Sequence, residues 1–129
     1  MNFHYTVESD LGMNETIEAL GKELKKRGFG VLWDFDLTAK LKEKGQSFDE
    51  PYRILEVCNP AEAARILSKN ELAAYFLPCK IVVYEKEGKT RIGLPKPTAL
   101  IEVIGDEGLK EIAVEVEKTL VEGIDQSRK

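Results

Sequence analysis

The sequence has few of the side chains that small proteins use as covalent or metal-bound cross-links. It contains 2 cysteines and 1 histidine among its 129 residues. Cys58 and Cys79 lie too far apart along the chain for a CxxC motif, so neither zinc-ribbon nor thioredoxin-like chemistry is indicated. A chain of this length can bury a core without such cross-links.

Long apolar runs are also lacking. No run approaches the roughly 20 residues that a membrane-spanning helix requires. The first segment, from Met1 to Gly12, has no basic stretch followed by an apolar one and is therefore unlike a signal peptide. We expect a cytoplasmic protein without a membrane partner, in which Cys58 and Cys79 are reduced thiols.

The sequence has no excess of positive charge. It carries 19 basic and 23 acidic side chains, for a net charge of −4. The densest basic cluster lies at the end of a predicted helix, where it complements the helix dipole: Lys22, Lys25, Lys26 and Arg27. This pattern predicts that the protein does not bind nucleic acid.

The residues that are present are typical of one globular domain. Hydrophobic residues make up 43% of the chain and charged residues 33%. No repeat, linker or low-complexity tract divides the sequence. We expect a single domain over residues 1–129, with a core from about 3 to 126 and a polar tail at 127–129.

Hydrophobic periodicity predicts the order of the elements. Strands are expected at 4–9, 30–35, 52–58, 79–84 and 90–94. Helices are expected at 14–27, 37–42, 60–69 and after 106, with N-caps at Asn14, Asp36, Asn59 and Asp106. The segment 97–104 fits either a strand or buried coil. Within the second strand, Val31, Trp33 and Phe35 are predicted to share one face.

These elements predict an α+β fold with a mainly antiparallel sheet and helices packed on one face. The order is strand, helix, four strands with a short helix inserted, and a final helix. The other face of the sheet is then open. Because an open apolar face lowers solubility, we expect a homodimer to cover it.

The two cysteines occur in the most distinctive local sequences, Val57-Cys58-Asn59-Pro60 and Leu77-Pro78-Cys79. Each lies at a strand edge beside a sharp change of chain direction. A thiol before a helix N-terminus favours the thiolate, which can act as a nucleophile, a redox group or a soft metal ligand. The more common role of free cysteine is buried packing, which we favour. The candidate site comprises Cys58, Asn59, Pro60, Pro78 and Cys79.

Three further residues are weaker candidates. His4 is the histidine that a catalytic triad or a Cys58/Cys79/His4 metal site requires, but it lies in a predicted strand near the terminus. Asp34 and Asp36 share a predicted strand face and can bind a cation, although capping and solvation explain them as well.

Aromatic side chains can line a ligand pocket, although aromatic residues at strand spacing are more often part of the core. The candidates are Phe29, Trp33, Phe35, Tyr75 and Phe76. The glycines form no phosphate-binding loop.

Several of these motifs, at their spacing, resemble the family catalogued as domain of unknown function 302. The resembling residues run over roughly 5 to 104: Glu15-Thr16, Lys26-Arg27-Gly28-Phe29, Asp36, Val57-Cys58-Asn59-Pro60, Leu77-Pro78-Cys79 and Val82-Val83-Tyr84. The resemblance implies a fold similar to one half of the TATA-binding-protein architecture, and small bacterial and archaeal proteins that often form dimers. The resemblance does not indicate which reaction the protein performs, if any, and it identifies neither a cofactor nor a catalytic residue.

Two functional hypotheses follow from the sequence. The first is a non-catalytic homodimer that binds a small ligand or a protein partner, because no convincing catalytic constellation is present. The second is a thiol-dependent redox or metal-binding protein that uses Cys58 and Cys79.

Overall fold

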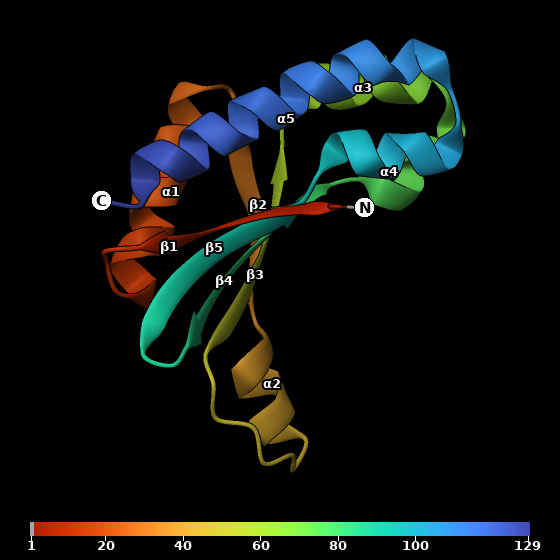
Figure 1. Ribbon diagram of the computed structural model, residues 1–129. Coiled ribbons are helices and arrows are strands. Elements are labelled where there is room, and N and C mark those ends of the chain that lie inside the picture. The colour runs from red at the N-terminus through yellow and green to blue at the C-terminus, as the bar shows by residue number, and fades with distance from the viewer. Residues whose placement is uncertain (1) are drawn as a thin grey trace.

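The computed structural model describes residues 2–129 as alternating strands and helices (Figure 1). The strands are β1 (His4–Ser9), β2 (Gly30–Asp36), β3 (Tyr52–Cys58), β4 (Cys79–Lys86) and β5 (Lys89–Pro95). The helices are α1 (Met13–Lys26), α2 (Leu37–Glu43), α3 (Pro60–Lys69), α4 (Pro97–Ile104) and α5 (Glu107–Ser127), with a 3₁₀ helix η1 (Glu71–Phe76) after α3.

The strands form one five-stranded sheet in the order β1-β5-β4-β3-β2, and every neighbouring pair is antiparallel. The β4–β5 hairpin is tighter than the sequence suggests, because both strands continue to a turn at Glu87 and Gly88. Both turn residues have positive φ, 54° and 76°, as a two-residue hairpin turn with the twist of the sheet requires.

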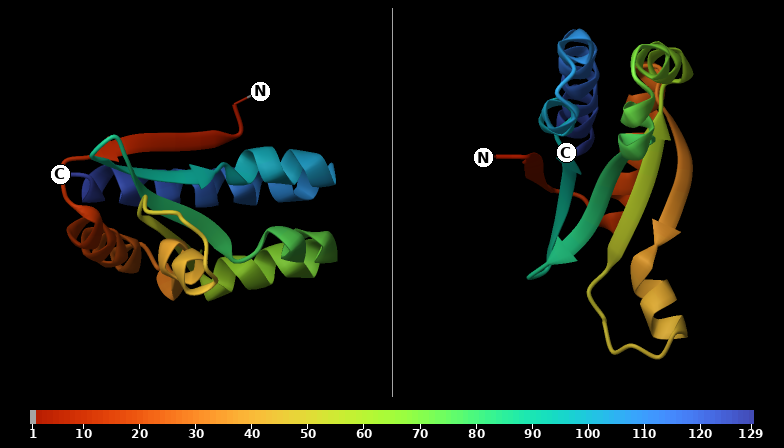
Figure 2. Two further views of the ribbon diagram at one scale, coloured as in Figure 1. Left: turned by 90° about the horizontal axis from the view of Figure 1, so that it is seen from below. Right: turned by 90° about the vertical axis from the view of Figure 1, so that its right-hand side faces the viewer.

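Helices α1 and α5 cover one face of this sheet and bury the core against it, and α3 and α4 continue the helical layer beyond the end of the sheet (Figure 2). In the left-hand view, α5 and α4 lie in one row and α1 and α3 in another. Leu20 and Leu24 of α1 meet the buried stripe of α5, which includes Leu120 and Ile124. The predicted α+β class, with an antiparallel sheet and helices packed against it, is confirmed.

The opposite face of the sheet is not covered by any helix of the described chain. Its central side chains are apolar or aromatic, and we call them the open sheet face: Trp33, Phe35, Tyr52, Ile54, Val82 and Tyr84. The rings of Trp33 and Phe35 stack at 5.0 Å, and those of Tyr52 and Tyr84 at 5.2 Å.

A bulge in β2 changes the predicted distribution of its side chains. The register shifts between Val31, which pairs with Val57, and Trp33, which pairs with Glu56. The prediction that Val31 shares a face with Trp33 is therefore wrong, because the extra residue, Leu32, interrupts the alternation.

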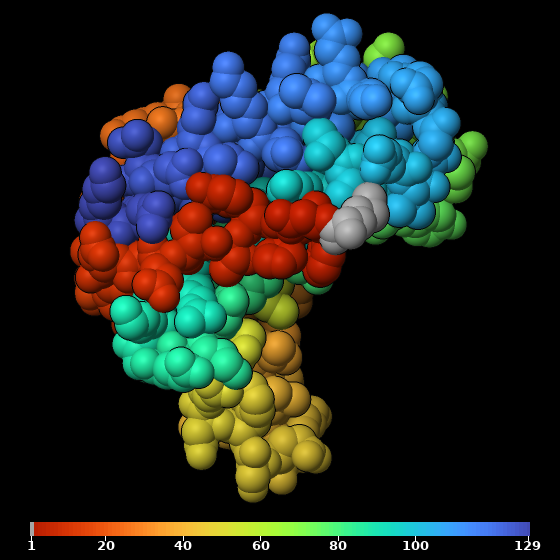
Figure 3. All heavy atoms as spheres, in the orientation of Figure 1, coloured from red at the N-terminus to blue at the C-terminus, as the bar shows by residue number. Residues whose placement is uncertain are grey.

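The segment after β2 extends away from the rest of the molecule. Figure 3 shows α2 and the loop that follows it as a narrow arm below the sheet. The arm is held at its base by Thr38, whose hydroxyl donates to the Glu50 carbonyl at 2.6 Å and accepts from the Tyr52 amide at 2.8 Å.

Three of the four predicted N-caps are confirmed. Asp36, Asn59 and Asp106 each accept a hydrogen bond from a backbone amide in the first turn of their helix, at 2.8–3.2 Å. The fourth is wrong, because the N-cap of α1 is Gly12, two residues before Asn14. The Glu15 carboxylate accepts from the Gly12 amide at 3.1 Å, which leaves Asn14 inside the helix.

Two local predictions at the C-terminal half are also wrong. Residues 97–104 form helix α4, which begins with proline at its first turn, as helices favour. The final helix continues to Ser127, whose side chain is buried, so 127–129 is not a free polar tail. Arg128 also donates to the Glu8 carbonyl at 2.8 Å. Within residues 2–129, none of the helices combines the length and apolar content that a bilayer crossing requires.

Candidate functional site

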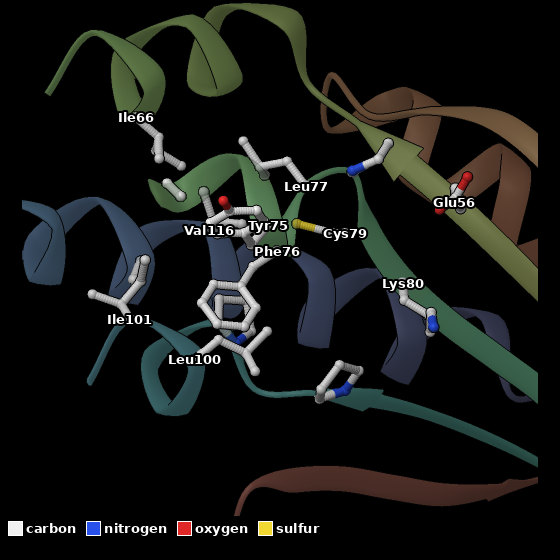
Figure 4. A pocket seen from close by; sticks show the side chains of 15 residues that line it. Glu56, Ile66, Tyr75, Phe76, Leu77, Cys79, Lys80, Leu100, Ile101 and Val116 are labelled. Carbon is white, nitrogen blue, oxygen red and sulfur yellow. The ribbon is translucent and has the colours of Figure 1, made fainter. Parts of the chain in front are cut away.

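A pocket of about 300 Å³ lies beyond the ends of β4 and β5, between the two rows of helices (Figure 4). We call it the η1–α4 pocket after the two short helices that border it. Most of its lining is apolar: Ile66, Ala73, Phe76, Leu77, Pro78, Pro95, Pro97, Leu100, Ile101, Ala113 and Val116. Glu56, Tyr75, Cys79 and Lys80 complete it.

Hydrogen bonds hold both borders of the pocket in place. At the start of α4, the Thr98 amide and hydroxyl both donate to the Glu117 carboxylate of α5, at 3.1 and 2.6 Å. Before η1, the Asn70 side-chain amide donates to Asp106 at 3.0 Å. Because these contacts join α4 and η1 to α5, the apolar walls keep their separation.

Cys79 lies in the wall of this pocket and faces the helices. It pairs with the buried Val57 across the β3–β4 ladder, and Figure 4 shows its sulfur directed towards Phe76 and Val116. Burial, with a smaller contribution from nearby Cys58, raises the pKa of the Cys79 thiol to about 11. At neutral pH the group is therefore an uncharged thiol.

Cys58 ends β3, where it pairs with Gly30 of β2. It borders a separate cavity of about 20 Å³, and Asn59 and Cys79 border the same cavity. Cys79 lies opposite Val57, one residue away from Cys58 along β3. Since neighbouring residues of a strand point to opposite faces, this register does not place the two cysteines directly opposite each other.

The five residues of the predicted cysteine site therefore have different surroundings. Pro78 and Cys79 line the η1–α4 pocket. Cys58 and Asn59 border only the small cavity, and the Asn59 side chain caps α3. Pro60 is exposed at the first position of α3 and borders neither.

The three weaker candidates have local partners. His4 lies on the edge strand β1, with its Nδ1 2.9 Å from the Thr6 hydroxyl. Asp34 pairs with Arg53, whose Nε donates to Oδ1 at 2.8 Å and whose Nη2 donates to Oδ2. Asp36 caps α2. No three His, Cys, Asp or Glu side chains of residues 2–129 are grouped closely enough to hold a metal, so His4 does not complete a site with the cysteines.

The predicted aromatic candidates separate into three groups. Tyr75 and Phe76 do line the pocket, and Tyr75 is 83% exposed rather than part of the core. Phe29 is a core residue. Trp33 and Phe35 belong to the open sheet face. Sequence reasoning missed the pocket residues of α4, because their segment was not recognised as a helix.

A second, wider hollow of about 780 Å³ lies along α1 and the chain terminus. Its lining is mainly charged and of both signs, and its carboxylates already pair with lysines, as in Glu18 with Lys22 and Glu23 with Lys26. Ala19 is the one apolar residue in this lining.

Comparison with protein families identifies the family of this chain. The family model described as "Domain of unknown function DUF302" matches residues 5–127. The chain belongs to this family. A crystal structure of an uncharacterized conserved DUF302 protein from Bacillus stearothermophilus is similar to it, with 57% identity and a TM-score of 0.97. That match covers 99% of this chain and 100% of the other. No curated protein matches.

Membership in DUF302 confirms the family expected from the cysteine and proline motifs. The matched region extends beyond them, through α4 and all of α5, so it includes every wall of the η1–α4 pocket. The family's description assigns no activity, and the chemistry of this DUF302 chain has to be inferred from its own side chains.

Proposed function

We propose that this protein is a cytoplasmic, non-catalytic homodimer that binds a small, largely apolar molecule in the η1–α4 pocket. The observation that carries the proposal is the pocket itself. Its volume of about 300 Å³ lies at the lower end of the range for small-molecule sites, and its walls are mainly aliphatic, aromatic and proline side chains.

The walls favour apolar atoms for a physical reason. Phe76, Leu100 and Ile101 present hydrocarbon surface from different elements, and a ligand that covers it releases the water there. Each Å² of apolar surface removed from water contributes about 25 cal/mol. The same lining contains no histidine, and its one cysteine is protonated at neutral pH, which supports binding rather than nucleophilic catalysis.

The homodimer in this proposal is supported by the open sheet face. Trp33 is 52% exposed and stacks on Phe35, which has Ile54 and Val82 in line with it on β3 and β4. Charges of both signs, among them Glu8 and Arg91, lie on the strands beside this patch. In a two-fold contact the same patch meets itself, so apolar centres face each other and opposite charges on the rims can pair.

A thiol-dependent function is the second hypothesis, and one observation favours it: Cys58 and Cys79 border the same small cavity. The raised pKa of Cys79 opposes it, because the thiolate is the form that attacks disulfides and binds soft metals. We therefore rank ligand binding first.

Titration with decanol, followed by NMR of the isoleucine and valine methyl groups, tests the pocket. We expect saturable shifts at Ile66, Ile101 and Val116, which line it. In Leu100→Trp the larger ring fills the pocket, and binding should be lost. Val103→Trp is the matched control on the same helix, because Val103 is 76% exposed and outside the lining. Absence of saturable shifts in the unmodified protein would refute the proposal.

A further inference from the structure

Two side chains of opposite charge, Glu56 and Lys80, line the η1–α4 pocket from the strands. Glu56 is the cross-strand partner of Trp33, and Lys80 follows Cys79, so both lie on the open-face side of the sheet, at the mouth of the pocket. They are direct partners across the β3–β4 ladder, which places their Cβ atoms about 5 Å apart. Figure 4 shows both on the strands, away from the cluster of apolar side chains around Phe76.

Neither charge is used by the rest of the described chain. Within residues 2–129, no ion pair or side-chain hydrogen bond joins Glu56 or Lys80 to each other or to another group. On β1, β3 and β5 the other charged residues do have such partners, as Arg53 has Asp34 and Arg91 has Glu8. On β4, the described Glu85 and Lys86 have none either, but they lie at the hairpin end of the strand, away from the pocket. A carboxylate and an ammonium group are thus available together beside an apolar pocket.

The deeper walls of the pocket restrict where the charged part of a ligand can lie. Ile66, Ala73, Ile101, Ala113 and Val116 provide no charge and no polar side-chain atom. An ion placed among them would lose its hydration without compensation, which is strongly unfavourable. The charged part of any ligand must therefore remain beside the strands, while its apolar part enters between the helices.

We propose that the pocket's ligand is a zwitterionic amphiphile, with an apolar body between the helices and a head that carries one cationic and one anionic group. The cationic group pairs with Glu56 and the anionic group with Lys80. A head of a single sign is attracted by one of these side chains and repelled by the other. This inference rests on the proposed function, since it names the ligand class of the same pocket.

Four ten-carbon probes test the inference by isothermal titration calorimetry, below their micelle concentrations or, for decanol, below its solubility limit. They are decanol, decanoate (whose tenth carbon is the carboxyl), decylammonium and decyldimethylglycine, whose heads differ in charge and also in size. The pocket has the volume of about ten water molecules, and a methylene group occupies a similar volume, so the flexible chain matches its size. We expect decyldimethylglycine to bind more tightly than decanoate and decylammonium, by about threefold, as for partly exposed ion pairs.

Variants that remove one charge test whether Glu56 and Lys80 bind the charged heads of the probes. Glu56→Gln should strengthen decanoate binding and weaken decylammonium binding, and Lys80→Gln should do the opposite. Glu111→Gln and Lys86→Gln are matched controls, because both residues are exposed and outside the pocket lining. These controls should leave the order of the probes unchanged.

The outcomes separate this inference from the proposal on which it rests. Suppose that decanol binds but decyldimethylglycine binds no more tightly than decanoate and decylammonium. The proposed ligand class is then wrong, while the proposal of an apolar pocket stands. The same conclusion follows if Glu56→Gln and Lys80→Gln do not change the affinities for decanoate and decylammonium in opposite directions. If none of the four probes binds, including decanol, both proposals are overturned.

Discussion

Cys79 is the residue whose chemistry differs most from its ordinary behaviour. Its thiol pKa is raised from 9.0 to about 11, chiefly by burial. Alkylation requires the thiolate, and a pKa two units higher leaves about a hundredfold less thiolate at pH 8. In a Cys58→Ser background, we expect iodoacetamide to modify Cys79 about a hundredfold more slowly at pH 8 than an unperturbed cysteine.

The pH dependence distinguishes a raised pKa from simple shielding of the sulfur. The modification rate of Cys79 should rise about tenfold for each pH unit and level off only near pH 11, because the neutral thiol is favoured up to that pH. The same chain unfolded in urea is the control and should level off near the ordinary pKa. A plateau of the folded-state rate below pH 9 would contradict the assignment and favour the thiolate hypothesis.

At the residue scale, the sequence predicts those features that depend on near neighbours. Asp36, Asn59 and Asp106 were identified as caps because each precedes a helical pattern and binds an amide within three residues. The prediction for Asn14 is wrong because Gly12, together with Glu15, caps the helix two residues earlier. The state of Cys79 depends on walls contributed by distant segments, and no local pattern contains it.

At the scale of elements, α3 allows a direct test of whether a cap predicted from the sequence stabilises its helix. Asn59 Oδ1 accepts from the Glu62 amide at 3.2 Å and so caps the helix. Replacement by alanine leaves that amide without its partner, and we expect Asn59→Ala to lower the free energy of unfolding by about 1 kcal/mol in urea denaturation. Asn59→Ser restores a capping oxygen and should recover most of the loss. Equal destabilisation by both variants would show that the cap is not the cause.

The elements that the sequence did not predict are short and are held by tertiary contacts. Helix α4 has 8 residues and η1 has 6. Such helices are marginal in isolation, because few hydrogen bonds offset the cost of nucleation. Glu117 binds the start of α4, and Asp106 binds Asn70 just before η1. The longer, amphipathic α1 and α5 carry a strong periodic signal, and for that reason they were predicted.

At the scale of the whole molecule, the candidate site results from the meeting of two helical rows beyond the end of the sheet. Its lining comes from β3, α3, η1, β4, β5, α4 and α5. Two residues of the predicted cysteine site, Pro78 and Cys79, line this pocket because they lie at the junction between η1 and β4. Sequence reasoning located that junction but not the pocket, which requires α4 and α5 to return beside α3.

The open sheet face leads to the last prediction, which concerns assembly. A stable dimer interface buries about 800 Å² on each partner, and buried tryptophan often contributes at least about 2 kcal/mol to such a contact. We therefore expect a dimer at micromolar concentration by analytical ultracentrifugation, and a dissociation constant raised about thirtyfold or more in Trp33→Ala.

Val114→Ala is the matched control for this experiment, because Val114 lies on α5 and is 51% exposed, close to the 52% of Trp33. Circular dichroism should show the same secondary structure in both variants, since neither side chain belongs to the buried core. If the unmodified chain sediments as a monomer, the homodimer is wrong. If a dimer persists equally in Trp33→Ala and Val114→Ala, the chains associate through a surface other than the open sheet face.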